Sequence, residues 1–340
     1  MADHNSNEEN SSDSSSLDEL LIEQEAVVEE TVEIPPASTN ETDRINEAED
    51  LAEVSDGETP DEQVPPTDKP EQIIQTYQGD EASTIWNIVG ASVQGTSHIK
   101  TNLPCQDYHN YNILTERTIV GAVADGLGSA SKSREGSKLA VDKAIEAISL
   151  VISQEYPTNE ESWETAVKRG FHEARSKLVK QAEATNCPLR EYGTTLIVII
   201  LNDEWLVTGQ VGDGAVVALF EEGQLETVSY PQGGEYANQT IPLTTPDALE
   251  HAKFSAKKAE IQAVAILSDG IQHLSINSAD HKPHAPFFTP IFGTLSTIND
   301  SQTISHQLAE YLASERVCAR TDDDKTLLLI GRKRADLIEG

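Results

Sequence analysis

The pattern of hydrophobic positions along the chain predicts two strands followed by two long helices. The apolar runs Ile85–Val93 and Thr118–Ala124 have the length and the content of β-branched residues that are typical of buried strands. Apolar residues then recur every three or four positions from Ser133 to about Ser153 and again over Glu160–Ala184. This is the spacing of amphipathic helices. We therefore expect a pair of helices after the second strand.

From residue 194 onward the pattern changes to short strands. The predicted strands are Thr194–Leu201, Trp205–Gln210, Ala215–Phe220, Leu225–Ser229, Ile261–Leu267 and Lys325–Arg332. Gly223 indicates a hairpin turn, and one further helix is predicted from about Thr303 to Ser314. Because the helices come in blocks instead of alternating with every strand, the sequence predicts an α+β fold. In this fold two packed antiparallel β-sheets form a sandwich flanked by α-helices.

The distribution of charge changes this picture near the N-terminus. The chain has 340 residues with 58 acidic and 24 basic side chains, and residues 1–80 hold 24 of the acids but only Arg44 and Lys69 among the bases. No aromatic residue precedes Tyr77. Such a segment cannot bury enough apolar surface to offset the entropy lost on folding. We therefore expect a disordered acidic N-terminal arm over residues 1–82, with a transient helix over Leu17–Val32 as an open alternative, and one globular domain over residues 83–336.

Net charge, apolar run length and cysteine spacing exclude several classes of protein. A net charge of −34 argues against a nucleic-acid partner, because phosphates would be repelled. The longest apolar runs, such as Leu196–Leu201, are far shorter than the ~20 residues of a membrane helix, and no secretory signal is recognisable. Cys105, Cys187 and Cys318 form no CxxC pair, which is typical of reduced thiols. We therefore expect a cytoplasmic protein with no membrane contact, and the sequence indicates no oligomeric state.

Several aspartates lie beside apolar strands and next to small residues. Asp125 and Asp269 each follow a predicted strand and precede a glycine. Asp213 lies between two glycines, and Asp323-Asp324 comes directly before the last strand. A carboxylate at a buried strand end is costly to desolvate unless a cation compensates it, and hard divalent ions prefer oxygen ligands. For any one position a simple Asp-Gly turn is the alternative, but the whole set favours a site for Mg²⁺ or Mn²⁺.

Six short motifs follow one another in the globular part of the chain. They are Cys105-Gln106-Asp107, Val123-Ala124-Asp125-Gly126-Leu127-Gly128-Ser129, Gly193-Thr194-Thr195, Val211-Gly212-Asp213-Gly214, Leu267-Ser268-Asp269-Gly270 and Asp323-Asp324-Lys325-Thr326. In this order and spacing they resemble the metal-dependent serine/threonine phosphatases of the protein phosphatase 2C family. Ser97-His98 followed by Gln106-Asp107 is similar to the opening of the bacterial branch. The resemblance covers the globular domain and implies the same helix-flanked sandwich.

The resemblance also implies a metal site and its ligands. The implied ligands are Asp107, Asp125, Gly126, Asp269 and Asp323, with Asp213 as the candidate for a third ion. Asp125 would bridge two ions, the Gly126 carbonyl would bind the second, and Asp107 would bind directly or through a water. Asp269 and Asp323 would hold the first ion. The implied cofactors are two or three Mn²⁺ or Mg²⁺ ions, with Asp107, Asp125 and Asp269 as the catalytic residues.

The activity that the resemblance implies is hydrolysis of phosphoserine and phosphothreonine in phosphorylated proteins. A hydroxide that bridges the metal ions would attack phosphorus directly, without a phosphoenzyme. Carboxylates at fixed positions then matter more than a side-chain nucleophile, so Cys105 is expected to be a packed thiol. The alternative is a catalytically weak family member that acts as a regulatory phosphoprotein-binding module.

Three positions depart from the family's pattern. Many members bind the substrate phosphate with an arginine where this chain has Asn102, and some have a histidine where it has Leu127. His273 replaces an aspartate that often helps to bind a third metal. The candidates for phosphate binding are His98, Lys100, Lys132 and Arg134, of which His98 and Arg134 are retained as site residues. Protonation of the leaving group would come from water or from His98.

Overall fold

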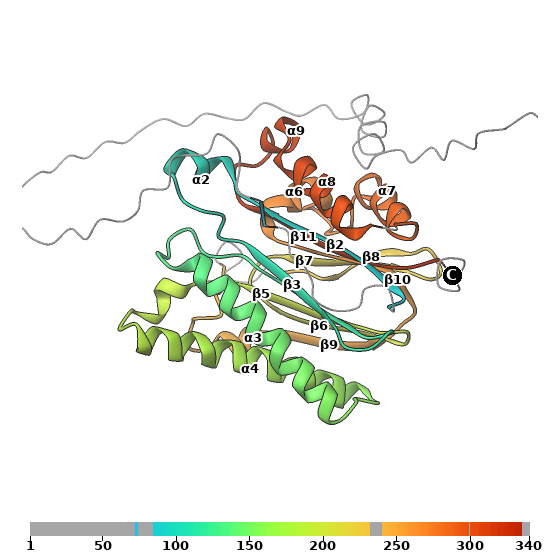
Figure 1. Cartoon of the computed structure of the whole chain (residues 1–340), viewed down its shortest axis with the longest axis horizontal. Coiled ribbons are helices and arrows are strands. Elements are labelled where there is room, and N and C mark those ends of the chain that lie inside the picture. Colours follow the sequence, from blue (N-terminus) through green and yellow to red (C-terminus); the bar gives the residue numbers. More distant parts are fainter. Residues whose placement is uncertain (1–71, 74–83, 232–239, 299, 335–340) are drawn as a thin grey trace, which may run out of the picture.

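Two β-sheets pack face to face and carry helices on both outer sides (Figure 1). This is a computed structural model, and it describes residues 72–73, 84–231, 240–298 and 300–334. The predicted α+β sandwich of antiparallel sheets flanked by helices is confirmed. Within the described residues one sheet has six strands and the other has five.

The first sheet has the strand order β1-β2-β11-β10-β7-β8, and all neighbouring pairs are antiparallel. Its strands are β1 (Gln72–Ile73), β2 (Trp86–Val93), β11 (Lys325–Arg332), β10 (Ile261–Leu267), β7 (Ala215–Phe220) and β8 (Leu225–Ser229). The register pairs Leu267 with Leu327 and Lys325 with Val93. The segment after β10, the segment before β11 and the end of β2 therefore meet at one edge of the sandwich.

The second sheet has the strand order β3-β4-β5-β6-β9. Its strands are β3 (Tyr108–Ile113), β4 (Ile119–Ala124), β5 (Leu196–Leu201), β6 (Trp205–Val211) and β9 (Lys253–Lys258). The sequence analysis did not predict β3 and β9, which lie at the two edges of this sheet. Edge strands have fewer buried positions than central strands, so their sequences need less apolar content. The central strand β5 is buried at every position.

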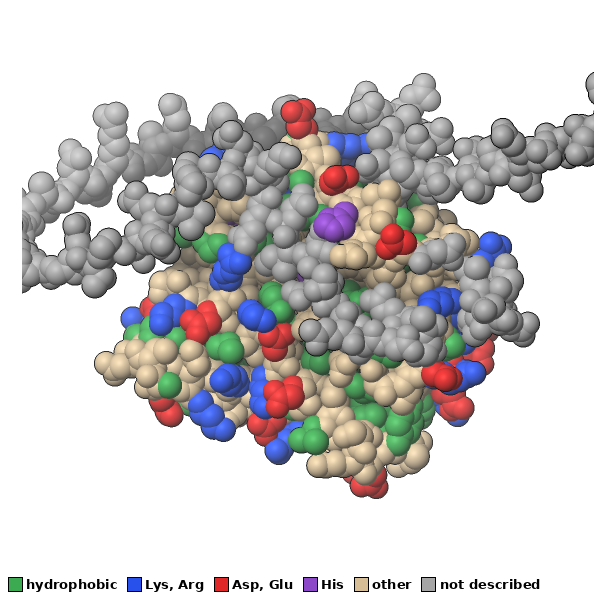
Figure 2. All heavy atoms as spheres, in the orientation of Figure 1, with side chains coloured by type: hydrophobic (Ala, Val, Ile, Leu, Met, Phe, Trp, Pro, Cys, Tyr) green, Lys and Arg blue, Asp and Glu red, His purple; other side chains and the backbone are tan. Residues whose placement is uncertain are grey.

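Helices α3 (Ser133–Gln154) and α4 (Glu160–Ala184) form the layer that covers the five-stranded sheet (Figure 1). Helix α4 begins where predicted because Asn159 caps it: its side chain accepts the backbone N–H of Ser162 at 2.9 Å. The inner faces of both helices bury apolar side chains against the sheet, with Trp163 and Phe171 fully buried. Figure 2 shows acidic and basic side chains intermixed over the outer face of this layer, as expected of a solvated helix surface.

The opposite layer consists of helices α6 to α9 over the six-stranded sheet (Figure 1). Its helices are α6 (Gln272–Ser275), α7 (Ala285–Leu295), α8 (Ser301–Ala313) and α9 (Glu315–Cys318). Helix α7 was not predicted, since Pro286 and Pro290 interrupt its hydrophobic pattern. Its aromatic side chains Phe287 and Phe288 are nevertheless buried against the sheet, and this packing outweighs the low helix propensity.

The shorter elements connect these layers. They are α2 (Thr96–Thr101), the 3₁₀ turn η1 (Leu189–Tyr192), α5 (Ala248–His251) and the 3₁₀ turn η2 (Asp269–Ile271). A third apolar cluster, which includes Ile88, Ile199 and Val264, fills the space between the two sheets. The central strands are therefore buried on both faces, which explains why their sequences are continuous apolar runs.

The predicted acidic arm over residues 1–82 falls almost entirely outside the described residues, as does the alternative helix over Leu17–Val32. Within that range the two described residues, Gln72–Ile73, form β1 and pair with Ser92 and Val93 of β2. The arm and the domain boundary therefore remain predictions. Among the helices that the structure describes, none combines the length and the apolar character needed to cross a bilayer.

Candidate metal centre

Aspartates that are far apart in the sequence meet at the edge where the strands of both sheets end. Asp125 directly follows β4, Asp213 lies between β6 and β7, and Asp269 follows β10 by two residues. Each offers a carboxylate oxygen, and these oxygens all lie within 4.8 Å of one another. In the part of the chain that the structure describes, these three residues form the one such group of potential metal ligands. Asp213, predicted as an optional ligand, thus lies with two of the three predicted catalytic aspartates, Asp125 and Asp269.

Asp125 is held in place by the Gly193-Thr194-Thr195 motif. The Asp125 carbonyl accepts the backbone N–H of Thr195 at 2.8 Å and the hydroxyl of Thr194 at 2.9 Å. In return the Asp125 N–H donates to Oγ1 of Thr195 at 2.9 Å. Both hydroxyls therefore bond to the main chain and leave the Asp125 carboxylate to face the other acids. The role of the Gly193-Thr194-Thr195 motif is therefore to position Asp125.

The glycines after Asp125 and Asp269 allow backbones to approach closely. A Cβ atom on Gly126 would lie 2.7 Å from the carbonyl oxygen of Gln106, and one on Gly270 would lie 1.9 Å from that of Asp324. Any side chain at either position would therefore displace a neighbouring main-chain segment. The Asp-Gly pairs are consequently packing constraints of the site as well as turns.

Asp107 and Asp323 complete the acidic surroundings of this group. The Asp107 side chain is 1% exposed, and its Oδ2 accepts the hydroxyl of Ser268 at 2.7 Å. Asp323 stands at the rim of the site, where its side chain is exposed, and its charge acts on both Asp125 and Asp269. The predicted ligands thus surround one edge of the sandwich, Asp107 deep inside it and Asp323 at its surface.

The carboxylates of the site repel one another in the absence of a cation. Burial and the charge of Asp324 raise the pKa of Asp107 well above its usual value, and burial together with Asp107 does the same to the pKa of Asp125. Burial and the charge of Asp213 raise the pKa of Asp269 from 3.8 to about 6. The pKa of Asp323 is also raised, because surrounding protein atoms displace water from it. Each shift has the direction expected of acids that lack a compensating positive charge.

The donor set fits a hard divalent cation. Oδ1 of Asp107, Oδ1 of Asp213 and Oδ1 of Asp269 are buried without a hydrogen-bond partner among the described residues. Buried carboxylate oxygens are normally hydrogen-bonded, so three such oxygens without a partner fit the binding of a cation. The ligand atoms that the predicted set offers to a metal ion are carboxylate and carbonyl oxygens, which Mg²⁺ and Mn²⁺ prefer.

His273, predicted as a possible partner of Asp213, lies outside the acidic group that the described residues form. Its side chain is exposed on α6. The neighbouring Gln272 contacts Asp213 instead, since its side-chain amide donates to the Asp213 carbonyl. The other contact of Asp213 is the hydroxyl of Thr240, which donates to Oδ2. The side-chain amide of Gln210 also donates to the carbonyls of Gly212 and Gly214, so three neutral side chains bond to the loop that bears Asp213.

Asn102, which replaces the arginine expected from the family, ends helix α2. Its backbone is left-handed, with φ 55°, and this region is more accessible to asparagine than to arginine. The N–H of Leu103 donates to the carbonyl of His98 at 2.9 Å, and that of Asn102 donates to the carbonyl of Ile99 at 3.2 Å. These two bonds define a Schellman motif. Asn102 therefore has a structural role, because it takes the left-handed conformation that ends α2.

The candidates for phosphate binding take different positions. The side chain of His98 is 12% exposed and places Nδ1 3.0 Å from Oδ1 of Asp324. Arg134 is exposed in the first turn of α3. Lys132 donates to the hydroxyl of Tyr192 at 3.2 Å, and Lys100 is exposed on α2. The structure therefore places His98 beside an acidic residue, while the other three candidates lie on the surface or against Tyr192.

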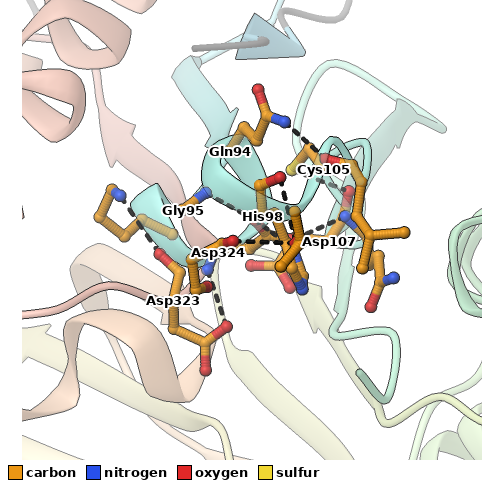
Figure 3. Close-up of polar contacts among 12 residues, drawn as sticks. Gln94, Gly95, His98, Cys105, Asp107, Asp323 and Asp324 are labelled. Atoms are coloured by element: carbon orange, nitrogen blue, oxygen red, sulfur yellow. Dashed lines mark hydrogen bonds and ion pairs between the residues drawn. The ribbon is translucent and has the colours of Figure 1, made fainter. Parts of the chain in front are cut away.

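Asp324 is a residue of the site whose role the sequence analysis missed. Its side chain is 2% exposed. Oδ1 accepts the N–H of Gly95 at 2.6 Å, and Oδ2 accepts the N–H of Gln106 at 2.6 Å (Figure 3). Asp324 therefore joins the start of α2 and the segment before Asp107 to the start of β11. The sequence signal for this role was the pair Asp323-Asp324. If one of two adjacent side chains faces the metal site, the other points in a different direction and needs partners of its own.

A buried hydrogen-bond network holds Ser268, the hydrogen-bond partner of Asp107, in place. Thr326 donates its hydroxyl to Ser92 at 2.7 Å and its N–H to Oγ of Ser268 at 3.0 Å. Oγ of Ser92 lies 2.8 Å from Nδ1 of His109. Burial lowers the pKa of His109 to about 4, so its ring is neutral at pH 7. Ser268, which donates to Asp107, is thus fixed by both sheets.

Cys105 is buried, and its Sγ lies 3.8 Å from the carbonyl of Asp107. The prediction of a packed thiol at this position is confirmed. Cys187 and Cys318 are also free thiols and are partly buried.

Comparison with known proteins identifies the family. The model of the protein phosphatase 2C family matches residues 94–313. Serine/threonine-protein phosphatase 3 of Escherichia coli strain K12 is 36% identical over 251 residues, which cover 72% of this chain and 97% of that protein. Among solved structures, a bacterial serine phosphatase matches with a TM-score of 0.51 and 14% identity over 72% of this chain and 97% of its own. The serine-threonine phosphatase 2C from Toxoplasma gondii matches with a TM-score of 0.50 and 14% identity over 78% of this chain and 100% of its own. The sequence likeness and the shared fold agree: the chain belongs to the protein phosphatase 2C family.

Proposed function

We propose that this protein is a metal-dependent phosphatase that hydrolyses phosphoserine and phosphothreonine in proteins. The observation that carries the proposal is the group of Asp125, Asp213 and Asp269, whose carboxylate oxygens lie within 4.8 Å of one another. Family membership and the E. coli relative support the same activity. A weak, phosphoprotein-binding member is not favoured, because the acidic residues that the family motif requires are present at one edge of the sandwich.

The residues that would hold the metal ions are those assigned from the sequence: Asp107, Asp125, Gly126 through its carbonyl, Asp269 and Asp323, with Asp213 for a third ion. Mn²⁺ or Mg²⁺ suits this set of oxygen donors. When bound, the ions would supply activation of the attacking water and neutralisation of charge on the phosphoryl oxygens.

The chain's own contribution is to hold these oxygens in place and to orient the substrate. The hydroxyl of Ser268 fixes one carboxylate oxygen of Asp107, and Thr195 fixes the backbone of Asp125. Such prior ordering lowers the reorganisation needed when charge develops in the transition state. His98 and Arg134 remain the proposed contacts of the substrate phosphate, and Leu127 leaves no proton donor of the chain next to Gly126.

Release of phosphate from p-nitrophenyl phosphate and from a phosphothreonine peptide in the presence of Mn²⁺ tests this function. We expect Asp125→Ala and Asp269→Asn to lower kcat by orders of magnitude and to weaken Mn²⁺ binding measured by calorimetry. Glu146→Gln on α3 is the control, since its exposed side chain forms an ion pair with Lys143 on the helix surface. Activity that persists in excess EDTA would refute metal-dependent hydrolysis.

A further inference from the structure

Two exposed apolar side chains, four positions apart in the sequence, lie on α2 and on the residue after its cap. Ile99 is 37% exposed and Leu103 is 39% exposed. The described residues contain only two other exposed large hydrophobic side chains, Leu150 and Tyr156. The hydroxyl of Tyr156 bonds to Thr118, so its exposure has a structural explanation. Single exposed apolar residues are ordinary, whereas apolar residues exposed near one another on a surface are typical of binding sites.

The start of α2 is bound to the segment that carries the acidic site. The Asp322 carbonyl accepts the N–H of Ser97 at 2.9 Å and its hydroxyl at 2.6 Å. Two residues after Asp322, Oδ1 of Asp324 accepts the N–H of Gly95 at 2.6 Å (Figure 3). Between Asp322 and Asp324 lies Asp323, a proposed metal ligand. Helix α2 therefore borders the site directly and keeps a fixed position against it.

The end of α2 is equally constrained. The Schellman motif at Asn102 fixes the turn that leads to Leu103. The carbonyl of Leu103 accepts the side-chain amide of Gln94 at 2.5 Å, and Figure 3 shows Gln94 over this turn. The backbone that carries Ile99 and Leu103 is thus bonded at both ends. A ligand that covers these side chains therefore does not have to order the backbone that carries them.

We propose that Ile99 and Leu103, named here the α2 patch, bind an apolar side chain of the phosphoprotein substrate next to its phosphorylated residue. The proposal rests on the proposed function, because it concerns the substrate of the same site. The occupant is the substrate because α2, the helix that leads into the patch, is bonded to Asp322 and Asp324 on either side of Asp323, and a phosphorylated side chain has to enter at this acidic edge. Burial of an apolar side chain at the patch would also offset part of the electrostatic cost of bringing a negatively charged peptide to this edge.

Kinetics with paired substrates separate docking from catalysis. Two phosphothreonine peptides that differ only by leucine or serine on either side of the phosphorylated residue are compared with p-nitrophenyl phosphate, which has no flanking residues to bind the patch. For Ile99→Ser/Leu103→Ser we expect KM for the leucine peptide to rise at least about fivefold, the factor that corresponds to about 1 kcal/mol of apolar contact. We expect kcat, the serine peptide and p-nitrophenyl phosphate to be unaffected. Leu150→Ser, which removes a 57% exposed leucine from α3, is the matched control and should change nothing.

Several results would overturn the proposal. An unchanged KM for the leucine peptide means that the patch does not contact the substrate. An equal loss with p-nitrophenyl phosphate means that the substitutions disturb the acidic site instead. A change confined to the elution volume in gel filtration assigns the patch to contact between two copies of the chain. If the wild type hydrolyses none of the three compounds, the proposed function fails, and fluorescence polarisation still decides whether the leucine peptide binds more tightly than the serine peptide and whether the double variant removes that difference.

Discussion

Replacing Asp269 by asparagine should stabilise the metal-free protein at neutral pH while it removes activity. Without a cation, the Asp269 carboxylate lies close to those of Asp125 and Asp213, and its Oδ1 has no hydrogen-bond partner within the described residues. An asparagine removes one negative charge from this group. Its amide can also donate to the Asp125 carboxylate, which a second carboxylate cannot do unless it is protonated.

The magnitude follows from the pKa of Asp269, which rises from 3.8 to about 6 on folding. Between these pH values the folded state holds a proton that the unfolded state has lost, so the free energy of unfolding decreases as pH rises through about 6. A rise of that size corresponds to about 3 kcal/mol, present below pH 3.8 and lost above the folded value. We therefore expect the Asp269→Asn protein to be more stable than the wild type by up to about 3 kcal/mol at pH 7.5.

Urea denaturation in EDTA at pH 7.5 and at pH 4.5 measures this difference. The variant and the wild type should differ at pH 7.5 and approach each other at pH 4.5, where Asp269 of the folded wild type is protonated. Addition of Mn²⁺ at pH 7.5 should stabilise the wild type and leave the variant almost unchanged, because ligand binding to the folded state alone raises stability. Glu146→Gln removes the same charge from an exposed position and should shift neither curve appreciably.

A variant that is less stable than the wild type in EDTA at pH 7.5 would refute the reasoning. That result would mean that Asp269 makes a favourable interaction in the metal-free protein that outweighs repulsion by Asp125 and Asp213. A gap between the two proteins that persists unchanged at pH 4.5 would also contradict it, because the effect would then not depend on the charge of Asp269.

Two further substitutions test how the site is held in place. Gly126→Ala places a methyl group 2.7 Å from the Gln106 carbonyl, so we expect a stability loss of about 1–3 kcal/mol in urea and weaker Mn²⁺ binding by calorimetry; unchanged values of both would show that the loop yields freely. In the wild type, the N–H groups of Gly95 and Gln106 each bond a different carboxylate oxygen of Asp324. Asp324→Asn replaces one of these oxygens by an amide NH₂ group, so one of the two backbone N–H groups loses its acceptor. We expect a loss of about 1–3 kcal/mol, and a denaturation midpoint equal to that of the wild type would remove Asp324 as a structural tie.

The sequence predicted the central strands well because strands that are buried on both faces have continuous apolar sequences. Ala215–Phe220, Ile261–Leu267 and Lys325–Arg332 have the predicted bounds, as does the edge strand Leu225–Ser229. The three central strands contain continuous apolar runs, such as Leu327–Ile330, because helices cover one face of their sheet and the other sheet covers the second. Helix α4 also begins and ends as predicted, since Asn159 provides a capping side chain that is recognisable in the sequence.

The missed elements owe their structure to tertiary contacts instead. Strand β9 has the sequence Lys253–Lys258, with three lysines, and takes its shape from pairing with β6 at the edge of the sheet. Helix α2 is six residues long and too short for a periodic pattern, and its position depends on Asp322 and Asp324, more than two hundred residues away. Contacts across such separations leave no signal in a local window of sequence.

The sequence predicted the acidic group of the candidate site but not the residues that hold it in place. Spacing beside strands and the family resemblance predicted Asp125, Asp213 and Asp269 as metal ligands, and the structure brings their carboxylates together because each lies near a strand end at the same edge. Their role as ligands stays a prediction. The residues that fix them, such as Ser268 and Thr326, are small polar side chains of a kind found throughout the chain. Their role becomes visible only when hydrogen-bond partners are known.

The acidic group also joins the two sheets, and this links its chemistry to the stability of the fold. Asp125 follows a strand of the five-stranded sheet, Asp269 follows a strand of the six-stranded sheet, and Asp213 lies on the connection between them. Repulsion among these carboxylates therefore pushes the ends of the two sheets apart, and a bound cation would draw them together. Neutral ties such as Ser268 to Asp107 hold the same edge without a cation. We therefore expect the sandwich to form without metal, and a bound cation to add stability at this edge.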